Sequence, residues 1–458
     1  MHHRRMKGLR EQLVARMRAA GVVGGPAIAR AFRTVPRHRF VPEVTAEQAY
    51  TDEVVPTKRD RNGRPISSAS QPSMVALMLR QLELRPGLRV LEIGAGTGYN
   101  AALLSELVGA NGQVSTVDID ADTVRRATDA LRTTGYRGVR VVHADGGHGL
   151  PESAPYDRIV VTAGASDLPP AWWQQLADGG LLVVPLRLSG LDLSIAFRKR
   201  AGTTPAADRL LSRTMVSCGF MPMRGAFGAH DDVLEVAGPG VRVVRRGRRA
   251  DLAPGSAPEQ MSEQVPELTG PRPGGHAAEG GWLRSALESP GSLRHSGVSA
   301  TVGEVMHGLA LWLATTEPGC CGLEVDPEAV RAGTVRSPLV APSGAARTTG
   351  LLEPDGLAVL AYLPTASDSS DLPDSSDLPG CPLDDLDTRV DVDVVGYGPR
   401  GVDVADRLMT GVQEWRRRGV TGPERMRVLA VPSGTPVRQR SDVLMLDRPH
   451  CRLLIRWL

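Results

Sequence analysis

The sequence predicts an α/β fold built on a doubly wound, mostly parallel sheet with helices on both faces, followed by a separate α+β domain. Three observations support this prediction. Short runs rich in Val, Ile and Leu alternate with helix-patterned segments from residue 73 to about 225, which is typical of a parallel sheet with crossover helices. A cluster of glycines follows one strand-like run, at 94–98. After residue 225 the alternation ends and the composition changes.

The elements of the first half follow from hydrophobic periodicity. Apolar residues recur at helical spacing over 6–33, where Gly21, Gly24, Gly25 and Pro26 divide the pattern into two short helices. Beyond residue 72, strand-like segments rich in β-branched residues alternate with helical ones. The expected strands are 89–94, 113–119, 139–145, 156–164 and 181–186, and the expected helices are 73–84, 99–109, 120–135 and 169–180.

The second half of the chain is expected to contain a linker and a second domain. Residues 236–290 are rich in Gly, Pro, Ser and Arg and have weak periodicity, as linkers do. Helix-like and strand-like apolar runs then return, at 302–325, 356–364, 390–399, 404–419 and 451–458. We therefore expect a first domain at 1–228, a linker at 229–290 and a C-terminal α+β domain at 291–458.

Composition argues against several classes of protein. The formal net charge is only +3, and only three of the 54 basic residues are lysines, so we expect no nucleic-acid partner. The five cysteines include no CxxC pair, which argues against a disulfide framework and a zinc site. No run of about 18 apolar residues occurs, so no signal peptide or membrane partner is expected. We expect a cytoplasmic protein, and a homo-oligomer remains open.

The strongest chemical signal lies in RVLEIGAGTGYNAALLSELVGANGQVSTVDID, residues 89–120. Gly94, Gly96 and Gly98 permit a tight strand-to-helix turn whose backbone N–H groups can approach a ligand closely. Asp118 follows about 20 residues after Gly98, at the end of the next expected strand. A carboxylate there can accept hydrogen bonds from both hydroxyls of a ribose, which indicates a nucleotide-like cofactor.

The glycine pattern departs from the GxGxxG of NAD sites, and Glu92 stands two residues before the first glycine. The stretch LEIGAGTGY resembles the AdoMet-binding motif of Rossmann-like methyltransferases. The alternative is a tight turn that binds no ligand. Asp145, at the end of a later strand, could accept a hydrogen bond from an adenine amine. His143 and His148 lie nearby, but no Cys, His or carboxylate spacing supports a metal.

Eight blocks of sequence follow one another in the first half of the chain. They are VPRHRFVPE (35–43), AYTDEVVP (49–56), SQPSMVALML (70–79), VLEIGAGTGYNAALL (90–104), HADGGHGLP (143–151), YDRIVVTAG (156–164), LADGGLLVVPL (176–186) and GFMPMRG (219–225). In this order they resemble the protein-L-isoaspartate (D-aspartate) O-methyltransferase family. The VPRHRFVP and SQP blocks are absent from generic methyltransferases, so they make the resemblance specific.

The resemblance implies transfer of the AdoMet methyl group to a peptide carboxylate, usually an isoaspartyl one, with S-adenosyl-L-homocysteine as product. The residues expected to bind the cofactor are Glu92, Gly94, Ala95, Gly96, Thr97, Gly98, Tyr99, Asp118, Ile119, Asp145, Gly146 and Thr162. Because a carboxylate is already ionised at neutral pH, no general base is required. The site must instead align one carboxylate oxygen with the methyl group.

In the family, the serine directly before QP supplies a hydrogen-bond donor for this alignment, and Ser70 matches it here. The alternative role for Ser70 is to cap the helix that follows. Upstream, the family's short glycine-containing loop is replaced by the longer and more basic TKRDRNGRPISSASQP, 57–72. Its arginines could hold an acidic peptide, or the loop could be merely solvated. The residues expected to bind substrate are Ser68, Ser70, Gln71, Val54, Arg59 and Arg64.

The C-terminal blocks DVVGYGPRGVDVADRLMTGVQEWRRRG, VPSGTP and LDRPHCRLLIRW are similar to the C-terminal region of longer homologues that accompany lanthipeptide and related ribosomal peptide biosynthesis. This likeness favours methylation of an Asp or isoAsp residue in a modified precursor peptide, leading through succinimide to isoaspartate or a stable imide. The alternatives are a repair methyltransferase with an accessory domain, a small-molecule carboxyl methyltransferase, and a non-catalytic AdoMet-fold binding module.

Overall fold

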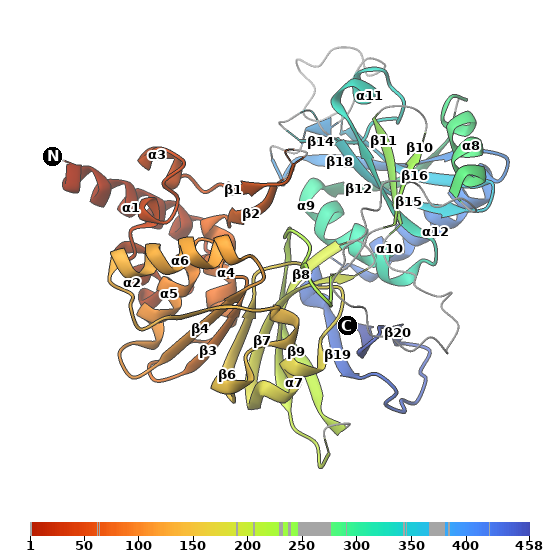
Figure 1. Cartoon of the computed structure of the whole chain (residues 1–458). Coiled ribbons are helices and arrows are strands. Elements are labelled where there is room, and N and C mark those ends of the chain that lie inside the picture. The colour runs from red at the N-terminus through yellow and green to blue at the C-terminus, as the bar shows by residue number, and fades with distance from the viewer. Residues whose placement is uncertain are drawn as a thin grey trace. The chain divides into compact units, whose positions relative to one another are not determined.

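The chain forms two compact units, shown in a computed structural model (Figure 1). The first unit comprises residues 1–187, 192–229 and 423–458, and the second comprises 188–191 and 230–422. No helix of the described residues is long and apolar enough to cross a membrane. The structure describes residues 2–61, 63, 65–188, 191–204, 207–228, 232–236, 240–245, 276–289, 291–341, 344, 346–365, 381–382, 385–420 and 422–458.

The first unit is built on a ten-stranded sheet with the order β20-β21-β19-β9-β8-β7-β6-β3-β4-β5. One half of this sheet is parallel, because β3 pairs with β4 and β6, β4 pairs with β5, and β6 pairs with β7. The predicted α/β class is therefore confirmed. The parallel strands are β3 (Arg89–Ile93), β4 (Gln113–Asp118), β5 (Arg140–His143), β6 (Tyr156–Val161) and β7 (Leu176–Leu188).

The other half of the sheet is completed from the far end of the chain. Strand β9 pairs antiparallel with β8, and through Leu210 and Leu211 it also pairs with β19. Strand β19 in turn pairs along its whole length with β21, which also pairs with β20. These strands are β8 (Leu191–Arg200), β9 (Arg209–Cys218), β19 (Met426–Pro432), β20 (Leu444–Asp447) and β21 (Cys451–Trp457).

This pairing corrects the predicted domain boundary. The prediction of one C-terminal domain at 291–458 is wrong for residues 423–458, which belong to the first unit. The apolar pattern of Cys451–Trp457 correctly indicates a strand. An apolar pattern requires that one face be buried, but it does not specify which sheet edge the strand joins. The first unit is therefore discontinuous in sequence.

Helices of the first unit pack their apolar faces on this sheet. Residues of α1, α2, α4 and α5 share one buried cluster with residues of β3, β4, β6 and β7, and Met17, Phe32, Leu79 and Val90 are examples. Burial of each large side chain contributes roughly 1.5–3 kcal/mol to stability. The helices are α1 (His2–Ala19), α2 (Pro26–Thr34), α3 (Ala46–Ala49), α4 (Pro72–Gln81), α5 (Tyr99–Val108), α6 (Ala121–Thr134) and α7 (Pro170–Gln175). Short 3₁₀ turns are η1 (Arg37–Arg39), η2 (Gly146–His148), η3 (Pro151–Ser153) and η7 (Pro423–Arg425).

Helix α7 is shorter than the predicted helix at 169–180. It ends at Gln175, and the chain is extended from Leu176 onwards, where it pairs with Tyr156 of β6. The ammonium of Lys199 donates to the carbonyl oxygens of Trp173 and Leu176. Carbonyl groups at the end of a helix lack partners within the helix, and Lys199 supplies donors for these two without a further helical turn.

A β-hairpin occupies most of the segment predicted as a loop at 57–72. Strand β1 (Val55–Arg59) pairs antiparallel with β2 (Pro65–Ala69), with register irregularities on both sides of Lys58. Val55 and Ala69 pack with Val41 and Ala49 in a small separate apolar cluster. The hairpin is therefore anchored at its base.

The second unit is a sheet of the order β10-β11-β13-β15-β16-β18-β12, and every pairing along this path is antiparallel. Its strands are β10 (Asp232–Val236), β11 (Val241–Arg245), β12 (Ser292–Thr301), β13 (Cys320–Val325), β14 (Leu339–Val340), β15 (Ala346–Glu353), β16 (Gly356–Pro364), β17 (Cys381–Pro382) and β18 (Arg389–Tyr397). Its helices are α8 (His276–Leu287), α9 (Val302–Glu304), the π-helix η5 (Val305–Leu309), α10 (Ala310–Thr316), α11 (Pro327–Arg331) and α12 (Gly401–Arg418).

The prediction of a linker at 229–290 is also wrong in part. Strand β11 pairs with β13 at the core of the second unit, and Val241 and Val243 are buried there. Helix α8 adds Leu283 and Leu287 to the same cluster. The Gly, Pro and Arg content of the surrounding residues obscures these short apolar runs in the sequence.

Candidate active site

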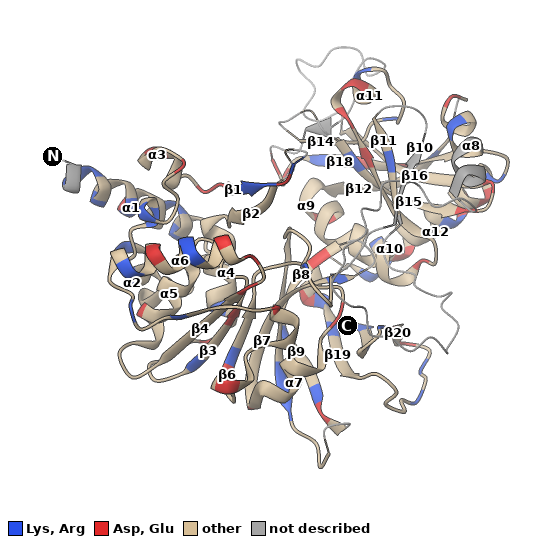
Figure 2. Cartoon of the chain, in the orientation of Figure 1, with Lys and Arg blue, Asp and Glu red and all other residues tan. Residues whose placement is uncertain are grey.

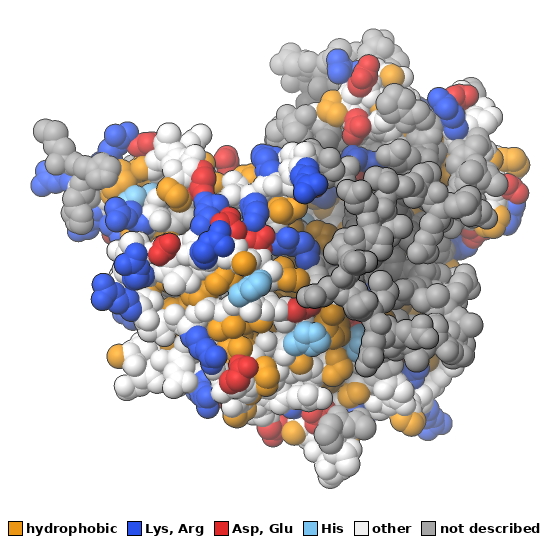
Figure 3. All heavy atoms as spheres, viewed as in Figure 1, with side chains coloured by type: hydrophobic (Ala, Val, Ile, Leu, Met, Phe, Trp, Pro, Cys, Tyr) orange, Lys and Arg blue, Asp and Glu red, His pale blue; other side chains and the backbone are white. Residues whose placement is uncertain are grey.

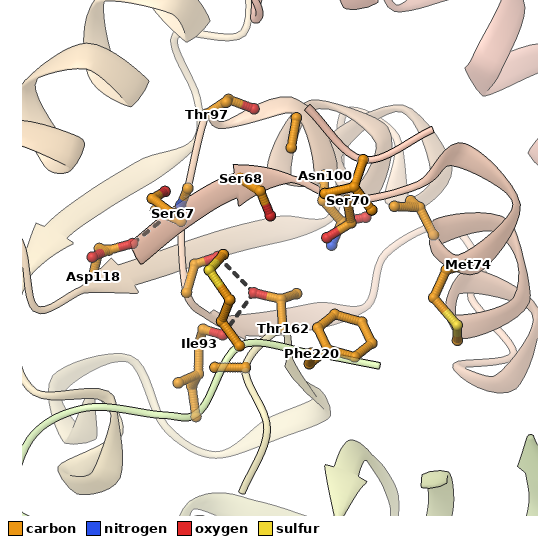
Figure 4. A pocket seen from close by; sticks show the side chains of 18 of the residues that line it. Ser67, Ser68, Ser70, Met74, Ile93, Thr97, Asn100, Asp118, Thr162 and Phe220 are labelled. Atoms are coloured by element: carbon orange, nitrogen blue, oxygen red, sulfur yellow. Dashed lines mark hydrogen bonds between the residues drawn. The ribbon is translucent and has the colours of Figure 1, made fainter. Parts of the chain in front are cut away.

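A cavity of about 420 Å³ lies in the first unit at the carboxyl ends of β3, β4 and β6. Open α/β sheets bind their ligands at this edge. The walls of the cavity come from β2, the start of α4, the glycine turn after β3 and residues 217–224. Figure 4 shows Ser67 and Ser68 of the hairpin on one side and Ile93 and Thr162 from the strand ends on the other.

The glycine turn at 94–98 brings backbone to the cavity wall. Gly94, Gly96 and Gly98 have φ angles of 101°, 51° and 83°, a region that glycine adopts without steric cost. At Gly94, a Cβ atom would lie 2.4 Å from the Oγ1 atom of Thr162. Glycine is therefore required here both for the backbone angles and for the close approach of Thr162, which follows β6.

Asp118, at the end of β4, lies beside this turn and lines the cavity. Its Oδ2 accepts a hydrogen bond from the N–H of Gly96 at 3.1 Å, and its Oδ1 accepts one from the N–H of Asp120 at 3.0 Å. These bonds fix the carboxylate, and each oxygen keeps a lone pair for a further donor. Ile119, which follows, lines the cavity and is 36% exposed.

Glu92 reaches the cavity wall from beneath the glycine turn and is 0% exposed. Burial raises the pKa of Glu92 to about 7, although two hydrogen bonds oppose this shift. The donors are the Oγ1 atom of Thr116 at 2.6 Å and the Nδ2 atom of Asn100 at 2.8 Å. The other amide atom of Asn100, Oδ1, is buried with no hydrogen-bond partner and belongs to a residue that lines the cavity. An acceptor is therefore available to a ligand N–H.

Other predicted cofactor residues have structural contacts. The Oγ1 atom of Thr162 donates to the carbonyl oxygens of Ile93 and Gly94 at 3.0 and 2.8 Å (Figure 4). Tyr99 is 3% exposed, and its ring packs edge-on against Phe32 and Phe40. The cavity is lined by Thr162, Tyr99, Ala95, Thr97 and Gly146. In contrast, Gly98 does not line the cavity and packs against α6.

Asp145 does not line the cavity. Its Oδ1 accepts a hydrogen bond from the N–H of Gly147 at 2.9 Å, and its Oδ2 accepts one from the N–H of Ala226 at 2.8 Å. This carboxylate caps η2 and holds the segment that follows residue 224. The expected contact with an adenine amine therefore stays a prediction, and the geometry gives Asp145 a structural role.

Ser70 lines the cavity between the hairpin and α4, together with Ser67 and Ser68. The alternative role of Ser70 as a helix cap is wrong, because the N-cap position of α4 is Gln71. Gln71 and Val54, two further residues predicted to bind substrate, also line the cavity.

The described basic residues of the hairpin, Lys58, Arg59 and Arg61, were expected to line the approach to the substrate, but they are not part of the cavity wall. The Nζ atom of Lys58 lies 2.7 Å from the Oδ2 atom of Asp120, and Arg59 donates to the carbonyl oxygen of Gly63 in its own hairpin. Figure 2 marks these basic residues on β1, and Figure 3 shows charged side chains of both signs beside one another where β1 and α6 lie. Arg64 lies outside the described residues.

Asn100, Phe220 and Arg37 are among the residues of the cavity wall that were not predicted. Arg37 is 1% exposed. Arg37 belongs to the specific VPRHRFVP block, which could have identified it. Among the residues that the structure describes, no group of three or more His, Cys, Asp or Glu could hold a metal ion.

Comparison with known proteins places the first unit in a family. The family model for protein-L-isoaspartate(D-aspartate) O-methyltransferase matches residues 8–224. The Methanopyrus kandleri protein-L-isoaspartate O-methyltransferase is 46% identical over 178 residues, which are 39% of this chain and 76% of the relative. The Methanothermobacter thermautotrophicus protein of the same name is 36% identical over 219 residues, 48% of this chain and 96% of the relative.

A solved protein-L-isoaspartate O-methyltransferase is similar over 92% of this chain and 96% of its own, with 21% identity and a TM-score of 0.45. A Plasmodium falciparum protein of that family, in complex with S-adenosyl-L-homocysteine, covers 48% of this chain and 98% of its own at 20% identity and a TM-score of 0.40. The residues that the family model matches include all those that line the cavity. The chain belongs to the protein-L-isoaspartate (D-aspartate) O-methyltransferase family.

Proposed function

We propose that this chain is an AdoMet-dependent carboxyl methyltransferase that acts on isoaspartyl residues of peptides and proteins, as a repair enzyme does. The observation that carries the proposal is the meeting of two groups of residues in one cavity. The glycine turn with Asp118 forms one wall, and the hydroxyl residues Ser67, Ser68 and Ser70 of the hairpin end form the other. The first group suits a nucleoside, and the second suits a carboxylate.

The residues present fit the proposed cofactor. The carboxylate of Asp118 is held by backbone N–H groups with lone pairs to spare, which suits ribose hydroxyls. The buried Oδ1 atom of Asn100 lacks a partner that a ligand N–H would supply. When bound, AdoMet supplies an electrophilic methyl group on a sulfonium.

The residues of this chain have the tasks of binding, orienting and desolvating the substrate. A carboxylate with a pKa near 4 is ionised at neutral pH, so it needs no base. In agreement with this, no His or Lys occurs among the described residues that line the cavity. The Ser70 hydroxyl would donate to one carboxylate oxygen and leave the other free to attack. In the resulting peptide ester, the next backbone amide nitrogen would attack the ester carbonyl carbon, the C–OCH3 bond would break, and the amide proton would leave with the methoxide as methanol, which closes a succinimide.

The curated relatives reported above favour repair over the tailoring of a ribosomal precursor peptide, which the C-terminal sequence blocks suggested. Both relatives are protein-L-isoaspartate O-methyltransferases, and the family match ends at residue 224. No contact of the described residues favours a precursor peptide over another isoaspartyl peptide.

The test is mass spectrometry of methyl transfer from AdoMet to three substrates: a linear isoaspartyl peptide, its aspartyl counterpart and a modified ribosomal precursor peptide. We expect methylation of the isoaspartyl peptide, and a reduction of kcat/KM by about 10- to 100-fold in Ser70→Ala, because a hydrogen bond to a charged group contributes about 1.5–3 kcal/mol. Asp118→Asn should weaken cofactor binding by a similar factor.

Ser105→Ala, on α5 outside the cavity wall, is the matched control and should keep full activity. Methylation of the aspartyl peptide with equal efficiency would contradict the isoaspartyl preference. Turnover restricted to a modified precursor peptide would replace repair by tailoring.

A further inference from the structure

From inside the protein, Arg37 joins two parts of the cavity wall, at Ser70 and Tyr99, to α3. It lies in η1, and its side chain is 1% exposed. Its Nε atom donates to the carbonyl oxygen of Ala49 at 3.0 Å, and its Nη2 atom donates to the carbonyl oxygen of Ser70 at 3.0 Å. Its guanidinium also lies 5.0 Å from the centre of the Tyr99 ring, directly after the glycine turn.

The positive charge of Arg37 has no carboxylate partner within ion-pair distance among the described residues. Both acceptors of its hydrogen bonds are backbone carbonyls, and its Nη1 atom is buried with no partner. The nearby carboxylate of Asp52 accepts hydrogen bonds from Ser73 and Gln71. A buried charge without a counter-ion is costly, and an arginine remains protonated.

The cavity that Arg37 lines is the one in which the proposed substrate carboxylate must be desolvated. The other cation of the described cavity wall is Arg224, which is exposed to water. A buried charge acts through a medium of low polarity, so its attraction for an anion is much less screened than that of an exposed one.

We propose that Arg37 determines specificity for an anionic substrate: its buried charge compensates the substrate carboxylate, and its hydrogen bond to the Ser70 carbonyl fixes the serine beside it. This inference rests on the proposed function. It assigns part of the binding of the substrate carboxylate to a residue that lies outside both the glycine turn and the SQP block. If Arg37 had a purely structural role, it would stabilise the fold, and its replacement would change the affinities for the charged and the neutral peptide equally.

The test compares two peptides that differ only in charge. One carries the isoaspartyl carboxylate, and the other carries a primary amide in its place. Their dissociation constants are measured by calorimetry on the full chain saturated with S-adenosyl-L-homocysteine, so no turnover is needed. We expect the wild type to prefer the carboxylate by about 10- to 100-fold, the range for a hydrogen-bonded charge.

Arg37→Gln keeps a hydrogen-bond donor but removes the charge, and it should reduce this preference about tenfold or more. Arg37→Lys keeps the charge and should retain most of the preference. The matched control is Arg158→Gln, because Arg158 is also a buried arginine whose partners are the backbone carbonyls of Leu82, Asp157 and Glu83. Arg158 does not line the cavity, so its loss should leave the preference unchanged.

Equal weakening of both peptides by Arg37→Gln would overturn the proposal and give Arg37 a structural role only. If Arg37→Gln fails to fold, as judged by thermal unfolding and S-adenosyl-L-homocysteine binding, Arg37→Lys decides: retention of the preference supports the proposal, and its loss contradicts it. Absence of methylation by the wild type would refute the proposed function, whereas the ratio of dissociation constants would still measure the charge preference of Arg37.

Discussion

At the scale of single residues, the buried carboxyl of Glu92 links stability to pH. Burial raises its pKa from 4.5 to about 7. A folded-state pKa above the unfolded value means that the folded state binds the proton more tightly. The stability contributed by this group is therefore fully present below pH 4.5 and is lost as the pH rises through about 7.

We predict that Glu92→Gln removes this pH dependence, because glutamine does not ionise. Between pH 5 and pH 8, the free energy of unfolding of the ligand-free wild type should fall relative to that of Glu92→Gln by on the order of 3 kcal/mol. Urea unfolding at the two pH values measures this difference. The exposed Glu152 provides the control, since Glu152→Gln should follow the wild type. Parallel pH profiles for wild type and Glu92→Gln would contradict the prediction.

At the scale of elements, the ammonium of Lys58 holds the hairpin β1–β2 to the start of α6 through ion pairs with Asp120 at 2.7 Å and Asp122 at 3.7 Å. Burial raises the pKa of Asp120, but hydrogen bonds from Lys58 and from the N–H of Thr123 outweigh it and hold that pKa at about 2. The stability of this contact is therefore present above pH 3.8 and is lost as the pH falls through about 2. Since residues of β2 line the cavity, these ion pairs also hold the cavity wall in place.

We predict that Lys58→Met loosens the hairpin at neutral pH. A partly exposed ion pair contributes about 1 kcal/mol, which corresponds to a roughly fivefold increase in hairpin opening. Hydrogen–deuterium exchange of residues 55–69 should accelerate by about this factor, and KM for the peptide should rise. Arg59→Met is the control on the same strand, because the side chain of Arg59 donates to the carbonyl oxygen of Gly63 within the hairpin. If both variants exchange hydrogen at the same rate as the wild type, Lys58 does not hold the hairpin in place.

At the scale of the whole molecule, the last 36 residues complete the sheet of the catalytic unit. Val428, Ala430, Leu453 and Ile455 are each at most 2% exposed. Beyond the strands, His450 donates its backbone N–H to the buried Asp167, and its ring lies 5.0 Å from that of Phe227, next to the cavity-lining residues 217–224. Loss of these residues would expose the edge of β9 and its apolar surroundings.

We predict that residues 1–229 alone aggregate or unfold, whereas 1–229 joined to 423–458 by a flexible linker fold and bind S-adenosyl-L-homocysteine. The buried apolar side chains of β19 and β21 contribute on the order of 10 kcal/mol, comparable to the whole stability of a domain. Thermal unfolding and calorimetric ligand binding of the two proteins check this. A stable, ligand-binding 1–229 fragment would mean that the terminal strands are dispensable.

Much of the site could be predicted from the sequence because its residues are close together in the chain. Gly94, Gly96 and Asp118 belong to one strand-turn-helix-strand unit, whose spacing brings them to the same sheet edge. The orientation of the Lys58 side chain could not be predicted, because its ion pair with Asp120 sets it. These two residues come close only because the hairpin packs on α6. The structural role of Asp145 could not be predicted for the same reason, since its carboxylate accepts a hydrogen bond from the N–H of Ala226, which lies far along the chain.

The sequence by itself determined the parallel half of the sheet, the glycine turn and the family, because local periodicity and turn chemistry depend on neighbours along the chain. Only the tertiary structure decided that Met426–Pro432 and Cys451–Trp457 extend the first sheet, and that the unpartnered charge of Arg37 reaches the Ser70 carbonyl. Pairing with a distant edge and burial of a charge depend on residues far apart in sequence. A local pattern specifies that a strand must pair, but the three-dimensional packing selects its partner.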